Sequence, residues 1–302
     1  MFLLLKYTLL YTVVLMMVAL GGMFSERSGI INIALEGIMV IGGLMGVIAT
    51  QLMPAGSSAF AIVAVSVLAA AIAGMVYAGL LAFASINQTI GGTALNLLAT
   101  ALAMVIAKGV NHSASAKLDY SNRAFIYDFG PLTVNVFLFI GLVALILSYI
   151  VLYKTRLGLR LRACGEHPQA ADSVGINVYK MRYIGVLISG VLGGIGGMAY
   201  IIPSVSSWNF EVGVSGAGFL ALAVMIFGQW KPFRIFLAAV FFALFKSLAN
   251  IASSIPFLAE LGWTQNMYNM IPFIASMIIL AFTSKKSRAP KAEGIPYDKG
   301  SR

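Results

Sequence analysis

Long apolar stretches, separated by short polar segments, run along almost the whole chain. A helix needs about 20 apolar residues to cross the hydrocarbon layer of a membrane. Nine stretches come close to that length, at residues 2–24, 30–52, 58–83, 89–107, 132–153, 183–203, 212–229, 234–254 and 268–283. The pattern predicts an all-α polytopic membrane protein with about nine to ten transmembrane helices. The first stretch is too long for the core of a signal peptide, so we expect it to remain as a helix.

Polar residues interrupt the second apolar stretch near its start. Residues 25–37 read Ser-Glu-Arg-Ser-Gly-Ile-Ile-Asn-Ile-Ala-Leu-Glu-Gly, which predicts a broken or re-entrant helix near residues 25–40. Asn32 and Glu36 are four residues apart, so on a helix they would share one face. A carboxylate at membrane depth usually faces a cavity or a partner. Glu36 is therefore a candidate pathway or gating residue, and a structural bond between two helices is an equally weighted alternative.

A basic loop at residues 154–182 lies between two of the longest stretches. It carries Lys154, Arg156, Arg160, Arg162, Lys180 and Arg182, and the positive-inside rule places such a loop in the cytoplasm. At its centre, Pro168 suits the first turn of a helix and Gly175 suits its end. A helix this short is not stable alone in water. The pattern therefore predicts a short cytoplasmic helix that docks against another protein.

The composition agrees with a membrane protein, since 60% of the residues are hydrophobic, 10% are charged and the mean hydropathy is +0.93. The formal net charge is +10, but 12 of the 20 lysines and arginines lie in the basic loop or in the tail after Thr283. Topology explains this distribution better than nucleic-acid binding does. Counting crossings from the basic loop puts the C-terminus in the cytoplasm and the N-terminus outside. If the interruption near Asn32 adds a crossing, the N-terminus moves inside.

Several segments carry a family resemblance. Besides residues 25–37, they are Asn-Gln-Thr-Ile-Gly-Gly-Thr-Ala-Leu-Asn at 87–96, Gly-Glu-His-Pro-Gln-Ala-Ala-Asp-Ser-Val-Gly-Ile-Asn at 165–177 and Gly-Ala-Gly-Phe-Leu-Ala-Leu-Ala at 216–223. Together they resemble ABC importer permeases of the ribose and branched-chain amino acid type. The start at 25–29 and His167, where the wider family commonly has asparagine, are similar to the nucleoside branch. In length and motifs the chain looks like the shorter of the two permease subunits in that branch.

The resemblance implies a permease domain over residues 1–283, with a coupling loop at 154–182 that contacts a separate ATPase. The expected coupling residues are Gly165, Glu166, His167, Pro168, Ala170, Ala171, Asp172 and Gly175. The expected pathway residues are Asn32, Glu36, Thr93 and Asn96. Thr93 and Asn96 are three apart and on one side of a helix, and hydrogen bonding between helices is the favoured alternative for them. Residues 284–302 are expected to form a disordered basic tail, because they lack the apolar content to fold.

The implied function is the membrane subunit of an importer in the bacterial cell membrane. It would carry a polar uncharged solute, foremost a nucleoside, by alternating access, and a simple-sugar permease is the alternative. The implied partners are an ATPase subunit that holds ATP and Mg, a second permease subunit and a substrate-binding lipoprotein. Both a heterodimer and a homodimer of permeases are open. No cofactor or metal is expected on this chain.

Two other function classes are considered. A secondary transporter would use an ion gradient and Glu36, whereas a membrane enzyme needs a nucleophile, base or metal cluster. The two histidines, His112 and His167, fall on opposite sides of the membrane in this topology, and no G-x-x-x-x-G-K-[ST] motif is present. The glycines between residues 190 and 197 lie within an apolar span at four-residue spacing, which predicts close helix packing rather than dinucleotide binding.

Overall fold

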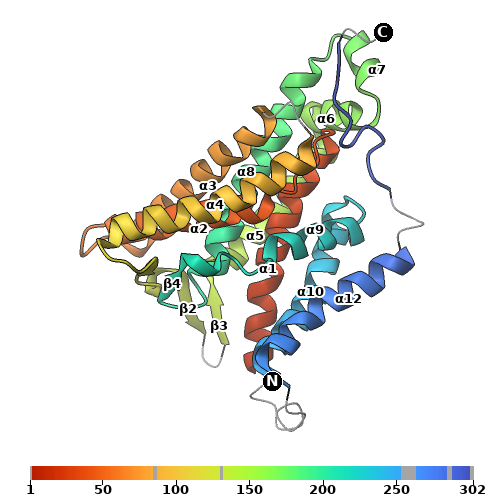
Figure 1. Cartoon of the computed structure of the whole chain (residues 1–302). Coiled ribbons are helices and arrows are strands. Elements are labelled where there is room, and N and C mark those ends of the chain that lie inside the picture. The colour runs from red at the N-terminus through yellow and green to blue at the C-terminus, as the bar shows by residue number, and fades with distance from the viewer. Residues whose placement is uncertain (1, 84–86, 130–131, 253–262, 284–287, 300–302) are drawn as a thin grey trace.

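The structure is a computed structural model that describes residues 2–83, 87–129, 132–252, 263–283 and 288–299. Within these ranges the chain is mostly helical (Figure 1). Seven helices are long and apolar enough to cross a membrane. They are α1 (Phe2–Arg27), α2 (Leu35–Leu52), α3 (Ala59–Phe83), α4 (Gln88–Asn111), α5 (Val136–Lys154), α8 (Val178–Ile201) and α10 (Pro232–Ile251). The prediction of a polytopic helical membrane protein is confirmed for this part of the chain.

One of the nine predicted crossings is shorter than expected. α9 (Ala217–Phe227) has 11 residues, so it is about 16 Å long and spans roughly half of the hydrocarbon layer. The prediction of a full crossing at 212–229 is therefore wrong. By contrast, α12 (Gln265–Thr283) has 19 residues and covers the predicted crossing at 268–283. Over the described residues, seven helices meet both the length and the hydropathy of a crossing, against the nine to ten predicted.

The chain also contains two small sheets, which an all-α prediction misses. β1 (Lys117–Asp119) pairs antiparallel with β4 (Ser207–Asn209), and β2 (Ile126–Phe129) pairs antiparallel with β3 (Leu132–Asn135). Short 3₁₀ helices, η1 (Arg123–Phe125) and η2 (Phe210–Val212), adjoin them. β3 occupies the start of the predicted crossing at 132–153, so that helix begins only at Val136. β1 pairs with β4 across about 90 residues of sequence. The pattern of apolar residues cannot predict a pairing between segments this far apart.

α8 is the central helix, and α1, α2 and α3 pack around it. Its glycines face two neighbours at once. A Cβ atom at Gly190 or Gly194 would collide with backbone atoms of α3, and one at Gly193 or Gly197 would collide with α2. The helices can approach this closely only because these side chains are absent. The interpretation of these glycines as packing residues is confirmed.

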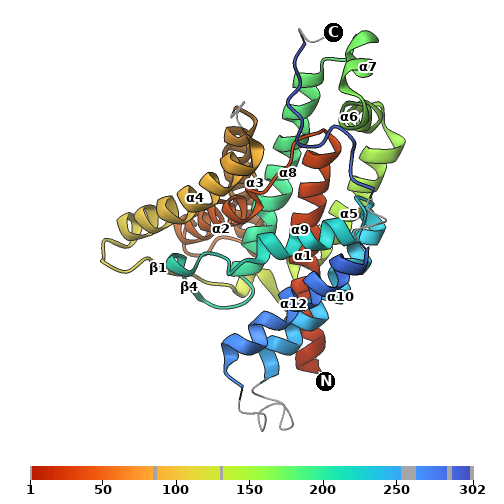
Figure 2. The ribbon, with the colours of Figure 1, turned by 45° about the vertical axis from the view of Figure 1, so that its right-hand side comes forward.

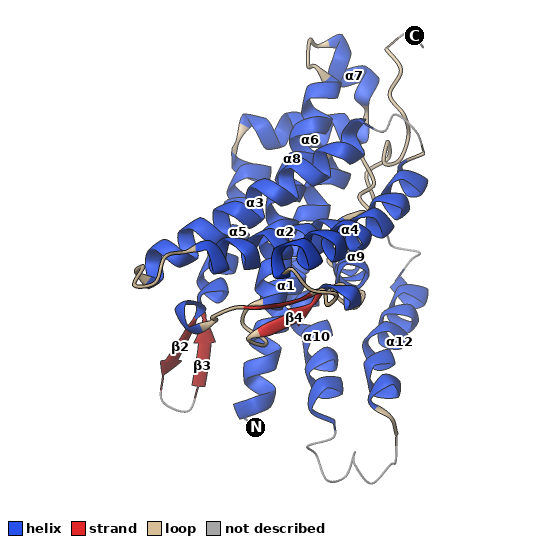
Figure 3. Cartoon of the chain, turned by 60° about the vertical axis from the view of Figure 1, so that its left-hand side comes forward, coloured by secondary structure: helices blue, strands red, loops and turns tan. Residues whose placement is uncertain are grey.

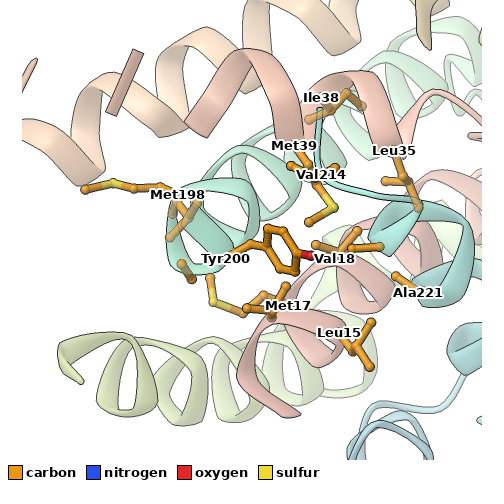
Figure 4. Packing of buried hydrophobic residues seen from close by; sticks show 14 of the residues in the cluster. Leu15, Met17, Val18, Leu35, Ile38, Met39, Met198, Tyr200, Val214 and Ala221 are labelled. Carbon is orange, nitrogen blue, oxygen red and sulfur yellow. The ribbon is translucent and has the colours of Figure 1, made fainter. Parts of the chain in front are cut away.

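Part of the buried core lies where α1, α2, α8 and α9 meet. Figure 4 shows the ring of Tyr200 among Met17, Val18 and Met39, with Ala221 of α9 close by. The side chains of α1 between Leu10 and Glu26 are buried almost without exception. A helix that is apolar all round and enclosed on all sides is typical of the centre of a membrane bundle.

The two ends of the molecule differ in character. The basic loop forms α6 (Arg156–Glu166) and α7 (Pro168–Ser173). These lie at one end together with tail residues 288–299, while the start of α1 lies at the other (Figures 1 and 3). α1 ends beside the basic loop, where Arg27 pairs with Glu166 at 3.5 Å. α2 runs back to the sheet end, where Gln51 donates to the carbonyl of Asp119. The interruption between α1 and α2 therefore adds no crossing, and the alternative that depends on an extra crossing is wrong.

Residues 292–297 of the tail contact the helices at the basic-loop end. The N–H of Ala292 donates to the carbonyl of Gly165 at 2.9 Å, and the ring of Tyr297 is only 8% exposed. The prediction of a disordered tail is wrong for these residues, because backbone bonds and one buried aromatic side chain hold them. Residues 284–287 and 300–302 lie outside the described ranges.

Substituting Gly194 tests the packing of α8 against α3. In Gly194→Ala the new Cβ atom would overlap the carbonyl oxygen of Ala70, and overpacking of this kind costs about 1–3 kcal/mol. We expect a lower thermal unfolding midpoint for the detergent-solubilised protein. Gly109→Ala on α4 is the matched control, since no atom lies within 4 Å of that position and alanine is the better helix former. Equal midpoints for the two variants would contradict the packing described.

Candidate functional site

The break between α1 and α2 (residues 28–34) has a local cause. The N–H of Ile30 donates to the carbonyl of Ser25 at 3.2 Å, and the N–H of Gly29 donates to that of Glu26 at 2.9 Å. These two bonds form a Schellman motif, in which the residue after the helix adopts a left-handed conformation. Gly29 does so, with a φ of 100°. The predicted interruption is thus a helix stop at Gly29, followed by a restart at Leu35.

The break separates Asn32 from Glu36. Asn32 lies in the non-helical segment, and Glu36 lies in the first turn of α2. The expectation that the two side chains share one helix face is therefore wrong. They contact different helices, and together they connect the break to the bundle at two points.

Side chains of two other helices, α4 and α8, bind the break. The Asn32 Nδ2 donates to Ser189 Oγ on α8 at 2.8 Å. Asn96 on α4 makes two bonds, because its Oδ1 accepts from the N–H of Gly37 at 2.8 Å and its Nδ2 donates to the carbonyl of Ile33 at 2.9 Å. Buried backbone groups without such partners would cost free energy, because they lose their bonds to water. The amide of Asn96 therefore takes over hydrogen bonds that the interrupted helix cannot make.

Glu36 connects α2 to the start of α9. Its Oε1 accepts from the N–H of Gly216 at 2.8 Å, and its Oε2 accepts from the N–H of Gly218 at 2.7 Å. The first N–H groups of a helix lack intrahelical partners and carry a partial positive charge, so a carboxylate is a strong acceptor for them. The side chain thus fixes the point at which the half-length helix α9 begins.

Thr93 does not join this cluster. Its side chain is exposed, and its hydroxyl donates to carbonyls of its own helix at Thr89 and Ile90. Asn96, three residues later, is 8% exposed. The expectation that both side chains point to one side is wrong, because α4 buries only a narrow stripe against α2. A further buried polar atom of the cluster, Asn32 Oδ1, has no hydrogen-bond partner among the described residues.

A small cavity lies beside the start of α9. It is lined by Tyr11, Val14, Leu15, Tyr200, Ala217, Leu220, Lys246 and Phe273, and its volume is about 10 Å³. That is room for roughly one water molecule, whereas pockets for small organic ligands measure roughly 300–1,000 Å³. This cavity does not admit an organic solute in the conformation observed.

The short helix α7 of the basic loop has the ends that its sequence predicts. His167 is the N-cap residue, although its side chain makes no capping bond, and Pro168 occupies the first turn. The N–H of Ile176 donates to the carbonyl of Ala171, and that of Gly175 donates to the carbonyl of Asp172. This is a second Schellman motif, with Gly175 at a φ of 83°.

α7 has an outer and an inner face. His167, Gln169, Ala170, Ser173 and Gly175 are exposed, and Val174 is 74% exposed. Ala171 is 4% exposed, and it packs in a cluster with Cys164, Val178, Met181 and Tyr297. The expectation that Ala170 and Ala171 both lie on an open docking surface is therefore wrong for Ala171. Burial also raises the pKa of the Cys164 thiol in this cluster, which favours its neutral form.

The remaining predicted coupling residues lie on the inner side of the loop or at its edge. Gly165 is buried against the end of α1, because a Cβ atom there would overlap the carbonyl of Arg27. Glu166 forms the ion pair with Arg27. Asp172 borders a groove of about 350 Å³ beside α7, which Gly175, Ile176, Asn177, Val178, Tyr179 and Lys299 also line.

Sequence reasoning misses several residues of the site. Gln88 accepts from the N–H of Ile31 through its Oε1 at 2.7 Å, and Ser189 binds Asn32. Gln88 belongs to the polar segment 87–96, so its position beside the predicted pathway residues was a usable signal. The indole of Trp230 donates to Glu26 Oε2 at 2.6 Å, a contact between distant segments that no local pattern indicates.

Comparison with known proteins agrees with this architecture. The family model described as "Branched-chain amino acid transport system / permease component" matches residues 4–281. The nucleoside ABC transporter permease protein NupC of Lactococcus lactis is 39% identical over 307 residues, which cover 96% of this chain and 95% of NupC. The guanosine ABC transporter permease protein NupQ of Bacillus subtilis is 39% identical over 311 residues, which cover 98% of this chain and 96% of NupQ.

A more distant relative is the nucleoside ABC transporter permease protein NupB of Lactococcus lactis. It is 27% identical over 173 residues, which cover 56% of this chain and 46% of NupB. No solved structure matches the chain. The match to the family model covers nearly all of the membrane-spanning helices described above. The chain belongs to the permease component family of branched-chain amino acid transport systems, and it is a multi-pass membrane transport subunit rather than an enzyme.

Proposed function

We propose that the chain is the permease subunit of an ABC importer for nucleosides. The observation that carries this proposal is near full-length identity of 39% to two permeases named for nucleoside and guanosine transport. A nucleoside is polar and uncharged, so a few hydrogen-bonding groups in an apolar wall suffice to bind it. The polar groups around the break are of this kind.

The path for the solute is proposed to lie between this chain and a second permease. The cavity beside α9 holds only about 10 Å³, which argues for a path formed jointly by two subunits. The exposed side of α4, with Thr93, is available to line such a path. The resemblance of the chain to NupC and, at greater distance, to NupB of the same organism supports a pair of unlike permeases. A substrate-binding lipoprotein would deliver the solute from outside.

The ATPase subunit is proposed to bind the outer face of α7 from the cytoplasm, with ATP and Mg held on that subunit. Exposed Ala170 keeps the surface low, and Val174 offers an apolar contact. Movement of α7 would then shift the break and the start of α9, which alternately opens the path to either side. Asn32, Glu36 and Asn96 would act in this step as gating residues, because they bind the break to α8, α9 and α4.

The decisive experiment is uptake by the reconstituted complex with its ATPase, second permease and lipoprotein. We expect ATP-dependent uptake of a labelled purine nucleoside that unlabelled nucleosides inhibit, and that ribose and branched-chain amino acids do not. Inhibition by ribose alone would instead favour the simple-sugar permease. Uptake that persists without the ATPase, and that depends on a proton gradient, would show a secondary transporter.

The substitution Ala170→Arg tests docking on α7. Ala170 is exposed, so arginine there should leave the fold intact and hold a partner away from the helix. We expect loss of co-purification with the ATPase, and a fall in uptake of about tenfold or more at normal membrane level, which corresponds to roughly 1.4 kcal/mol of lost binding.

Ala114→Arg is the control, because Ala114 is also exposed but lies beside β1, outside the basic loop. It should retain co-purification with the ATPase. Ala171→Arg should behave differently again, since it places a charge in the buried cluster and should lower the membrane level itself. Full co-purification and uptake with Ala170→Arg would refute docking on this face.

The substitution Glu36→Gln tests gating at the break. Glutamine keeps one acceptor oxygen but replaces the other with an NH₂ group, so one N–H at the start of α9 loses its partner. A hydrogen bond to a charged group contributes about 1.5–3 kcal/mol, so we expect uptake to fall by about tenfold at nearly unchanged membrane level.

Glu211→Gln is the control for this experiment. Glu211 lies in η2, and its carboxylate pairs with Lys108 at 3.7 Å with both side chains partly exposed, so its loss should change uptake little. If the membrane level of Glu36→Gln falls in step with its uptake, Glu36 is a structural bond between α2 and α9 and not a gating residue.

A further inference from the structure

A short part of the C-terminal tail, residues 292–297, crosses the basic-loop end of the molecule. Figure 2 shows this dark-blue segment passing beside the top of α1, α6 and α8. The N–H of Ala292 donates to the carbonyl of Gly165 in the basic loop at 2.9 Å. Two residues later, the N–H of Gly294 donates to the carbonyl of Gly29 in the break at 3.2 Å. This segment, here called the strap, is thus hydrogen-bonded to both the basic loop and the break.

The end of the strap is anchored on the inner side of the basic loop. The hydroxyl of Tyr179 donates to the carbonyl of Tyr297 at 3.1 Å, and the two rings lie 5.3 Å apart in an edge-on arrangement. The ring of Tyr297 packs in the same buried cluster as Ala171 of α7. The inner face of α7 therefore packs in the same cluster as the strap. Its outer face is the proposed docking surface.

Arg182 gives the strap a polar anchor on α8. The residue is 6% exposed, and its Nη2 donates to the carbonyl of Ile295 at 3.0 Å. Its Nε has no hydrogen-bond partner among the described residues. A buried guanidinium with few partners is costly, so removal of the strap would take away a bond that this charge depends on.

Glu293 connects the strap to α1. It shares a side-chain hydrogen bond with Glu26 and faces the positive charge of Arg27. Burial raises the pKa of the Glu293 carboxyl, because the charged form is disfavoured away from water. The strap therefore contacts α1, the break, the basic loop and α8 within six residues.

We propose that the strap is a mechanical link that carries movement of α7 to the break. This inference rests on the proposed function, in which an ATPase moves α7. Ala292 would be displaced together with Gly165, and Gly294 would then displace Gly29 and Ile31. The strap is thereby a coupling element of the transport cycle in addition to the contact between Arg27 and Glu166.

The substitution Gly294→Ala tests the link by wedging the strap away from the break. The new Cβ atom would lie 2.6 Å from Ile31 Cδ1, at a φ of 74°. Energetic coupling between two sites is typically about 5–150-fold, so we expect uptake per ATP hydrolysed to fall about fivefold or more. Co-purification with the ATPase should be unchanged, because the outer face of α7 is untouched.

Two further variants separate coupling from backbone strain. Gly56→Ala introduces alanine at a similar φ of 91°, but with no atom within 4 Å, so it should leave uptake per ATP unchanged. Ile31→Val removes the Cδ1 atom that the new methyl group would meet. Combined with Gly294→Ala it should restore uptake per ATP to within about twofold of Ile31→Val alone, the mark of a direct contact between the two sites.

The outcomes distinguish this inference from the proposed function. If the unaltered complex shows no ATP-driven uptake, the proposed function fails and the strap inference falls with it. If the unaltered complex is coupled and Gly294→Ala couples equally well, the strap inference alone is overturned. It is also overturned if uptake and ATP hydrolysis fall in equal proportion with membrane level, because the strap then only stabilises the fold.

Discussion

A helix that stops inside an apolar bundle leaves backbone N–H and C=O groups that water cannot reach, and each unpaired group is costly. The structure meets this constraint at the break with side chains from other helices. Gln88 and Asn96 of α4 accept from the N–H groups of Ile31 and Gly37, and Glu36 accepts from two N–H groups at the start of α9. The positions of α2, α4 and α9 follow from these bonds, since α2 and α4 bring the polar side chains and the start of α9 brings the backbone N–H groups that Glu36 binds.

The same hydrogen bonds determine how much free energy a rearrangement of the break requires. Intramolecular hydrogen bonds contribute about 0.5–1.5 kcal/mol each in net terms, because broken bonds are replaced by others. Exchanging the few that bind the break therefore involves several kcal/mol, the range in which a partner with unequal affinity for two states can shift an equilibrium. Structural bonding and gating are thus compatible roles for Asn32, Glu36 and Asn96. What distinguishes the roles is whether their partners change during transport.

Features that neighbouring residues determine can be predicted from the sequence, and features that distant contacts determine cannot. Apolar length located the spans, and Pro168 with Gly175 located α7 to within one or two residues, because helix ends are encoded by neighbouring residues. The direction of side chains was harder to predict. Thr93 and Asn96 differ in burial, as do Ala170 and Ala171, because burial depends on which neighbour packs there. Contacts over long separations, such as Trp230 with Glu26 or Tyr297 with Tyr179, leave no periodic pattern, so the sequence does not predict the contacts of residues 292–297.

Because α7 is short, the contacts of its inner face keep it helical. Six residues form too few intrahelical hydrogen bonds to be stable alone, so tertiary contacts must hold the helix in shape. Those contacts are made by buried Pro168 and by Ala171 in its cluster with Tyr297. A partner that pushes on Ala170 therefore acts on a body that includes the cluster beneath it. Because the strap belongs to that cluster and also bonds to Gly29, a displacement of α7 that leaves the break in place must first break contacts of the strap.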